Sequence, residues 1–185
     1  MQQSVGGRHL SLLARLLPTP ADAGRYPTEI HPIPPQPQRS MKITVETTVD
    51  APLADVWHAW NNPDDIVKWN AASDDWHTTR AATDLRVGGV LSSRMEAKDG
   101  SMGFDFAGTY TQIETQRLIE YELDDGRTVR VEFAPTDKGV TVCETFDAES
   151  THSEEQQRAG WQAILDRFAN HVTSLDRSRT SQNAG

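Results

Sequence analysis

One acidic residue interrupts an apolar face of a predicted strand. Val142, Glu144 and Phe146 alternate with outward positions, so their side chains are predicted to point into the molecule. A buried carboxylate is costly unless it is paired, hydrogen-bonded or protonated. Three interpretations follow: a bulge turns Glu144 outward, an internal Tyr or Trp donor satisfies it, or it is the polar end of a ligand site. Partnered inward acids are common, but the ligand site is the most specific hypothesis.

Other residues with reactive or metal-binding side chains lack the spacing that chemistry requires. The segment 74–77 holds two Asp and one His but no second His or Cys nearby, so we interpret it as a surface loop. Glu96 and Asp105 are predicted opposite each other across a hairpin, on an outer face where they join a solvated charge cluster. Cys143 points outward. The sequence has no nucleophile elbow, Walker loop or dinucleotide fingerprint, so we expect no metal or other cofactor.

Charge and composition exclude several kinds of partner. The 185 residues suffice for one domain with a core. The net charge is −9; residues 1–40 carry +2 and residues 176–185 carry +1, which leaves −12 on residues 41–175. Such an acidic domain repels phosphate backbones, so we expect no nucleic-acid partner. No apolar run is long enough for a membrane span. A single cysteine fits the cytoplasmic location that we expect.

The two ends of the chain differ in composition from its middle. Residues 18–40 contain seven prolines, which prevents regular backbone pairing. We therefore predict a disordered, Pro-rich extension over residues 1–40, a folded domain over 41–175 and a disordered polar tail over 176–185.

Within the domain, the hydrophobic period changes in a definite order. Residues 42–49 alternate as a strand, and two proline-initiated helical segments follow at Pro52 and Pro63. From residue 76 to 146, alternating segments between Gly and Asp-Gly pairs predict five or six more antiparallel strands. A capping box then begins a helix at Ser153. Its apolar stripe consists of Trp161, Ile164, Leu165, Phe168 and Val172.

Two predicted hairpins have mutually consistent registers. One turns at residues 99–102 and the other at residues 124–126, where Gly126 suits a left-handed backbone. Agreement between registers supports a sheet more strongly than propensity does. The predicted pairs are Met95 with Phe106, Ser93 with Gly108, Tyr121 with Val129, and Ile119 with Val131.

The order of these elements and several motifs resemble a known superfamily. The sequence Ala51-Pro52, followed by Val56-Trp57-His58-Ala59-Trp60, resembles the opening of the SRPBCC, or START-like, proteins. One branch of that superfamily, named for the activator of the heat-shock-protein-90 ATPase, has motifs similar to Asp84–Gly89, Gly108–Tyr110, Gly160-Trp161 and Leu165-Asp166. The chain also resembles a largely bacterial subgroup, in segments 95–100, 103–106 and 144–149. Over residues 41–175 the resemblance implies an α+β helix-grip fold, in which a curved antiparallel sheet of six to seven strands wraps a long C-terminal helix.

The resemblance also implies a function class. Members of the superfamily bind lipids, hormones or aromatic compounds, and a few cyclise polyketides. We therefore expect a small hydrophobic or aromatic ligand between the sheet and the last helix, with a homodimer left open. The expected lining is Trp69, Trp76, Leu91, Ser93, Met95, Phe104, Phe106, Tyr110, Tyr121, Phe133, Glu144, Phe146, Trp161, Leu165 and Phe168.

Two alternatives stay open at this point. In the first, the protein is a cyclase- or hydrolase-like enzyme in which Glu144 acts as acid or base. In the second, it is an interaction domain that modulates the chaperone ATPase. Residues 1–40 do not resemble the additional N-terminal domain with which the eukaryotic activator engages the chaperone.

Overall fold

Seven strands and three helices make up the folded part of the chain. The structure is a computed structural model that describes residues 41–183, with side chains described to Ser178, so the predicted extension over residues 1–40 lies outside the described residues. The elements are β1 (Lys42–Val49), α1 (Leu53–Asn61), α2 (Pro63–Trp69), β2 (Trp76–Thr83), β3 (Val90–Ala97), β4 (Gly103–Glu114), β5 (Leu118–Leu123), β6 (Thr128–Thr136), β7 (Gly139–Asp147) and α3 (Glu154–Asn183).

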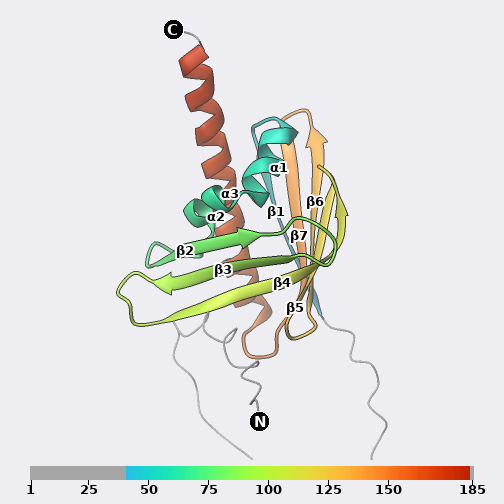
Figure 1. Cartoon of the computed structure of the whole chain (residues 1–185), viewed down its shortest axis with the longest axis vertical. Helices are drawn as coiled ribbons and strands as arrows, with labels where there is room; N and C mark the ends of the chain where they lie inside the picture. The colour runs from blue at the N-terminus through green and yellow to red at the C-terminus, as the bar shows by residue number, and fades with distance from the viewer. Residues whose placement is uncertain (1–40, 184–185) are drawn as a thin grey trace, which may run out of the picture.

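The strands form one antiparallel sheet that bends around α3 (Figure 1). Its order is β1-β7-β6-β5-β4-β3-β2, so only β1 makes a non-sequential pairing, with β7. In Figure 1, β2, β3 and β4 run across the view while β6 and β7 run roughly along α3. The helix-grip fold predicted from the sequence is confirmed, with the larger of the two predicted strand numbers.

The two hairpin predictions have different outcomes. The β5–β6 register is as predicted, with Tyr121 opposite Val129, and Gly126 has a φ of +83°. The β3–β4 prediction is wrong by two residues, because Met95 pairs with Phe104. The turn lies one residue earlier in the chain than predicted, since the backbone N–H of Ala97 donates to the carbonyl of Met102. Since side chains alternate with a period of two, a shift of two residues leaves every side chain on its predicted face.

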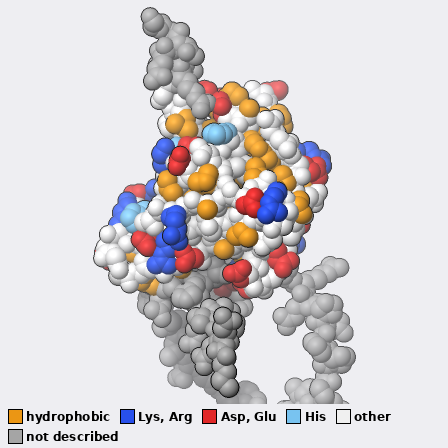
Figure 2. All heavy atoms as spheres, in the orientation of Figure 1, with side chains coloured by type: hydrophobic (Ala, Val, Ile, Leu, Met, Phe, Trp, Pro, Cys, Tyr) orange, Lys and Arg blue, Asp and Glu red, His pale blue; other side chains and the backbone are white. Residues whose placement is uncertain are grey.

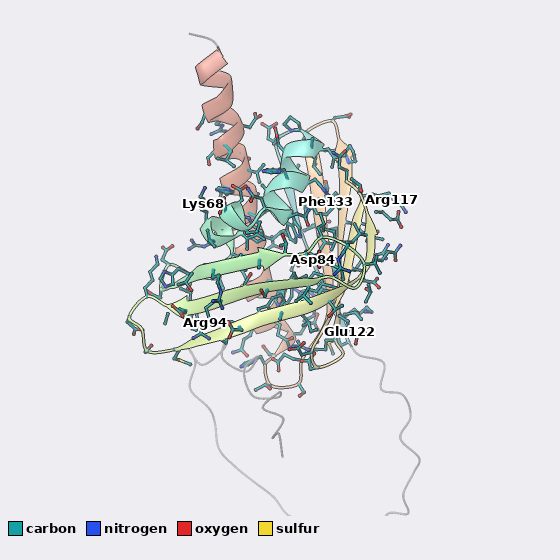
Figure 3. All side chains as sticks on the ribbon, viewed as in Figure 1. Lys68, Asp84, Arg94, Arg117, Glu122 and Phe133 are labelled. Carbon is teal, nitrogen blue, oxygen red and sulfur yellow. The ribbon has the colours of Figure 1, made fainter. Side chains whose placement is uncertain are left out.

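The same shift changes one pairing on the outer face of the sheet. Glu96 lies opposite Gly103, and Asp105 lies opposite Arg94, so the two acids do not face each other as predicted. Arg94 instead bridges them, with Nε 2.8 Å from Glu96 and Nη1 3.3 Å from Asp105 (Figure 3). The predicted solvated charge cluster is therefore present. On the face shown in Figure 2, acidic and basic side chains are interspersed with separate hydrophobic ones.

The last helix begins as predicted and continues further than predicted. The Ser153 hydroxyl accepts a hydrogen bond from the backbone N–H of Gln156 at 3.2 Å, and the Gln156 side chain accepts one from the Ser153 N–H at 3.1 Å. α3 continues to Asn183, so residues 176–183 are helical where the sequence predicted a disordered tail. No Gly or Pro occurs between residues 176 and 183 to end the helix.

Side chains of α3 also cover the free edge of β1. Arg158 Nη1 donates to the carbonyl of Thr44 at 2.6 Å, and Gln162 Nε2 donates to the carbonyl of Glu46 at 3.0 Å. These carbonyls lie on the side of β1 that has no neighbouring strand. The helix is thus fixed to the sheet by polar contacts at its rim and by its apolar stripe, where Leu165, Phe168 and Val172 are buried.

Candidate functional site

Strand register places Glu144 in the middle of an apolar row. Glu144 on β7 lies between Val131 of β6 and Val45 of β1, and Ile119 of β5 lies beyond Val131 in the same row. All four side chains are buried, and β7 has no register shift at Glu144. The interpretation that a bulge turns this residue outward is therefore wrong, and the carboxyl group lies on the concave side of the sheet.

The next row of inward side chains is aromatic. Tyr110 of β4 pairs with Tyr121 of β5, which pairs with Val129 of β6, and Val129 pairs with Phe146 of β7. The two rows are two residues, or about 7 Å, apart along each strand, which is close enough for large side chains to meet diagonally. The two Tyr rings make an edge contact with centroids 6.4 Å apart.

Trp161 of α3 closes this row from the helix side. Its ring stacks on Phe146 with a centroid distance of 4.0 Å and an interplanar angle of 14°. Phe106 of β4 makes edge contacts with both Trp161 and Tyr121, each at 6.3 Å. Apart from the Trp161–Phe146 stack, these rings meet at their edges, and they do not fill the space between the sheet and α3.

A cavity of about 160 Å³ lies in that space. Its lining combines β3, β4 and β5 with Glu144 of β7, parts of α1 and α2, and the first half of α3. Nine of the residues predicted to line it do so: Trp69, Leu91, Ser93, Met95, Phe106, Tyr110, Tyr121, Glu144 and Trp161.

Glu144 is the buried acid in this wall. Its exposed fraction is 4%, and no described residue donates a hydrogen bond to its carboxyl group. Burial alone raises the pKa of Glu144 to about 8. The predicted alternative of an internal Tyr or Trp donor is therefore not realised among the described residues. The group stays largely protonated at neutral pH, and it can donate or accept a hydrogen bond with a molecule in the cavity.

The two tyrosines of the wall are held in their neutral form. Burial, and secondarily the nearby charge of Glu144, raise the pKa of Tyr121 well above its ordinary value. Burial and the charge of Asp84 raise the pKa of Tyr110 to about 12. Both rings therefore present neutral aromatic surface to the cavity.

One end of the cavity has polar residues that are already engaged with one another. His152 Nδ1 is hydrogen-bonded to the Glu149 carboxylate, and Gln157 donates to the backbone carbonyls of both residues. Burial opposes ionisation of Glu149, but hydrogen bonds from Thr151 and His152 outweigh it, so the pKa of Glu149 is lowered. Arg127 at the same lining is paired with Asp125, Nη2 to Oδ2, at 2.9 Å.

Six residues predicted to line the cavity lie outside its wall. Phe133 (labelled in Figure 3) and Phe168 instead join an aromatic cluster with the tryptophans of α1 and α2, in which the Phe168 and Trp60 ring centroids lie 4.9 Å apart. Trp76 packs against Phe104, also predicted as lining, with ring centroids 5.8 Å apart. The remaining two are Phe146, which lies behind Trp161, and Leu165, which is fully buried in the core.

Several lining residues were not among those predicted from the sequence. Trp60 of α1 and Ile66 of α2 reach the cavity, as do Ala82 and Thr83 of β2. Helical spacing indicated that Trp60 points inward, because it lies one helical turn from Val56 on the apolar face of α1. For the β2 pair, alternation alone does not indicate how far the sheet curls over α3.

Among the residues that the structure describes, no group of three or more His, Cys, Asp or Glu side chains is placed to hold a metal ion. No helix within residues 41–183 is both long and apolar enough to cross a membrane.

Solved structures from bacteria resemble this chain. The AHSA1-like protein from Aeromonas hydrophila is 51% identical with a TM-score of 0.69, and the match covers 73% of this chain and 94% of that one. The protein Chr148 from Cytophaga hutchinsonii is 47% identical with a TM-score of 0.62, covering 77% and 94%. The protein CV1439 from Chromobacterium violaceum is 22% identical with a TM-score of 0.65, covering 72% and 98%, and is similar in fold. No curated protein matches the chain significantly.

A family model covers most of the folded domain. The family described as Activator of Hsp90 ATPase homolog 1-like protein matches residues 50–173, which include both short helices, β2 to β7 and most of α3. The match confirms the resemblance stated from the sequence motifs. The chain therefore belongs to this family of Activator of Hsp90 ATPase homolog 1-like proteins, whose START-like fold is that of ligand-binding domains.

Proposed function

We propose that the protein binds a small, largely apolar molecule whose one polar group hydrogen-bonds to Glu144. The observation that carries this proposal is a buried carboxyl group, without a donor among the described residues, in the wall of a largely apolar cavity with several aromatic rings. A protein that needed only a packed core would lose nothing by having an apolar residue there, as at Val142 and Phe146 on the same strand. A ligand supplies the missing partner.

The size of the cavity limits the ligand. An apolar cavity of about 150 Å³ accommodates a molecule the size of benzene. At about 160 Å³, this one suits a single aromatic ring with one or two further heavy atoms. Trp161 and Tyr121 provide flat surfaces for the ring, and Glu144 fixes its orientation.

The first experiment uses two probes that differ in one polar group. Benzyl alcohol and toluene are titrated into the full chain while NMR follows the backbone amides and the indole N–H of Trp161 and Trp60. We expect both probes to shift these signals, with benzyl alcohol about tenfold tighter because it can hydrogen-bond to Glu144. The Glu144→Leu variant should lose that difference.

A matched control separates the site from the overall charge of the protein. Glu122 lies on β5 with its side chain exposed on the outer face of the sheet. Glu122→Leu should leave both affinities unchanged. If neither probe shifts signals of cavity residues, and native mass spectrometry of protein from its natural host shows no bound small molecule, the proposal is refuted.

The same carboxyl group supports a second candidate, an acid catalyst. Because burial raises the pKa of Glu144 to about 8, the group carries a transferable proton near neutral pH. Turnover of an aromatic or polyketide substrate that is lost in Glu144→Gln, while binding persists, would favour catalysis over binding alone.

A further inference from the structure

We propose that the polar group of the ligand is a protonated amine, which forms an ion pair with the Glu144 carboxylate inside the aromatic cavity. This inference rests on the proposed binding function and specifies its ligand class: a small aromatic or alkyl ammonium compound. Three features support it: Glu144 has no hydrogen-bond donor among the described residues, aromatic rings line the same cavity, and the charged side chains of the lining already pair with other residues.

The rings beside Glu144 suit a cation. Tyr121 and Trp161 line the cavity from opposite sides, with Phe106 in edge contact with both. The face of an aromatic ring carries partial negative charge and attracts ammonium groups, most strongly when water is excluded. A carboxylate next to such faces provides the counter-charge. Neutral Tyr121 and Tyr110 keep their faces available, since burial raises the pKa of both phenols.

The other ionisable groups of the lining do not provide an alternative partner for Glu144. Arg127 is paired with Asp125, and His152 is hydrogen-bonded to Glu149. The residues that flank Glu144 in the sheet, Val131 on β6 and Val45 on β1, are apolar. On the α3 side the cavity is lined by Gln156, Gln157, Gly160, Trp161 and Ile164, which carry no charge.

Charge also discriminates against anionic ligands. A carboxylate or phosphate entering the cavity would meet Glu144 without a free cation among the described lining residues. The whole domain over residues 41–175 carries −12, which attracts cations and repels anions at a distance. An ammonium group is thus favoured over the fatty acids and phosphorylated lipids that a generic apolar cavity would admit.

Pairing with an ammonium group has a measurable proton linkage. In the unliganded protein the pKa of Glu144 is raised to about 8 by burial. Roughly nine-tenths of these groups are then protonated at pH 7, so formation of the ion pair releases about 0.9 proton per ligand bound. A neutral ligand that hydrogen-bonds to the protonated acid releases none. Proton release therefore distinguishes an ion pair from a hydrogen bond at the same residue.

The test adds benzylamine and benzoate to benzyl alcohol and toluene, because the four probes share one ring and differ in one group. Dissociation constants come from NMR titration of the full chain at pH 7. Proton release comes from calorimetry in two buffers of different ionisation enthalpy. We expect benzylamine to bind at least about tenfold tighter than benzyl alcohol, since charge assistance strengthens the contact. Benzoate should bind more weakly than toluene.

Substitution assigns the effect to one carboxyl group. Glu144→Gln should reduce benzylamine affinity about tenfold, to that of benzyl alcohol, and abolish proton release. Benzyl alcohol should change less than about threefold, because the amide introduced by this substitution still accepts its hydrogen bond. The outer-face control Glu122→Gln should change none of these values. Proton release by the unsubstituted protein is an independent readout should the Glu144→Gln protein fail to fold.

The outcomes separate this inference from the proposed function. If benzyl alcohol or toluene binds as tightly as benzylamine, the amine inference is overturned while the binding function stands. Tighter benzylamine binding without proton release, or with the preference intact in Glu144→Gln, also overturns it, because the cation then lies elsewhere. If none of the four probes reaches the cavity, the proposed function fails and this inference fails with it.

Discussion

Replacing Glu144 by Gln should change how the stability of the protein depends on pH. The side chain is 4% exposed, and burial raises the pKa of its carboxyl group from 4.5 to about 8. Each unit of difference between the folded and unfolded pKa corresponds to about 1.4 kcal/mol. The full displacement therefore corresponds to about 5 kcal/mol, as an order of magnitude.

The sign follows from proton binding in the two states. Above pH 4.5 the unfolded chain releases the Glu144 proton, whereas the folded protein keeps it until the pH approaches 8. The folded state then binds more protons than the unfolded state, so the free energy of unfolding falls as the pH rises between these values. The stability associated with this group is fully present below pH 4.5 and is lost as the pH rises through the folded pKa. The amide side chain of the Glu144→Gln variant does not titrate, so it contributes only a constant offset.

Urea denaturation of the two proteins measures this effect. Unfolding is followed by tryptophan fluorescence at pH 5, 6, 7 and 8, with Glu122→Gln as the exposed control. We expect the stability of Glu144→Gln relative to the unsubstituted protein to rise by about 1 kcal/mol for each pH unit, reaching several kcal/mol at pH 8. The control should stay parallel to the unsubstituted protein. Parallel curves for Glu144→Gln as well would refute the claim that a buried, unpaired carboxyl group lies in the cavity wall.

Three further predictions use the same denaturation assay. Burial opposes ionisation of Asp65, but hydrogen bonds from His171, at 2.8 Å, and from Asn62 outweigh it and lower the pKa of Asp65. Asp65→Asn should therefore lower the free energy of unfolding by about 2 kcal/mol at pH 7, and this loss should shrink as the pH falls below about 4. A loss that does not depend on pH would contradict this. Ser153→Ala should cost about 1 kcal/mol by removing the cap of α3, while Ser153→Asp should cost little; equal losses would argue against capping. Gly139 has a φ of +113°, and a Cβ there would lie 2.1 Å from the Val49 carbonyl oxygen, so Gly139→Ala should lower the free energy of unfolding by more than about 2 kcal/mol. Gly160→Ala should cost almost nothing, because a Cβ there would meet nothing within 4 Å. Similar costs for the two substitutions would contradict the steric argument.

The strand pattern allowed much of the concave wall to be predicted. Alternation along β7 assigned Glu144 to the inner face, and the β5–β6 register placed Tyr121 opposite Val129, because a period of two is determined by local sequence. The β3–β4 register was wrong by two residues because the position of the turn along the chain depends on backbone hydrogen bonds such as that from Ala97 N–H to the Met102 carbonyl. Because the register error was two residues and side chains alternate with a period of two, the same β3 and β4 side chains still point toward the cavity.

The division between cavity and solid core could not be predicted in the same way. Phe133 and Phe106 both point inward from neighbouring parts of the sheet, yet Phe133 packs against Trp57 and Trp60 while Phe106 borders open space. The difference depends on where α1 and α2 lie over the sheet. That position is set by tertiary packing, and hydrophobic periodicity carries no information about it. Helical spacing does place Trp60 on the apolar face of α1, but which part of that face borders the cavity depends on the same tertiary packing.

The contacts of Arg158 and Gln162 with β1 have a consequence for self-association. A strand with open carbonyls at the margin of a sheet is a template on which a second polypeptide can continue the hydrogen-bonded ladder. Here two of those acceptors, on Thr44 and Glu46, are already occupied by side chains of the neighbouring helix. The helix that bounds the cavity thus also blocks aggregation through this edge. Shortening both side chains would expose a site for strand addition without changing the hydrophobic interior.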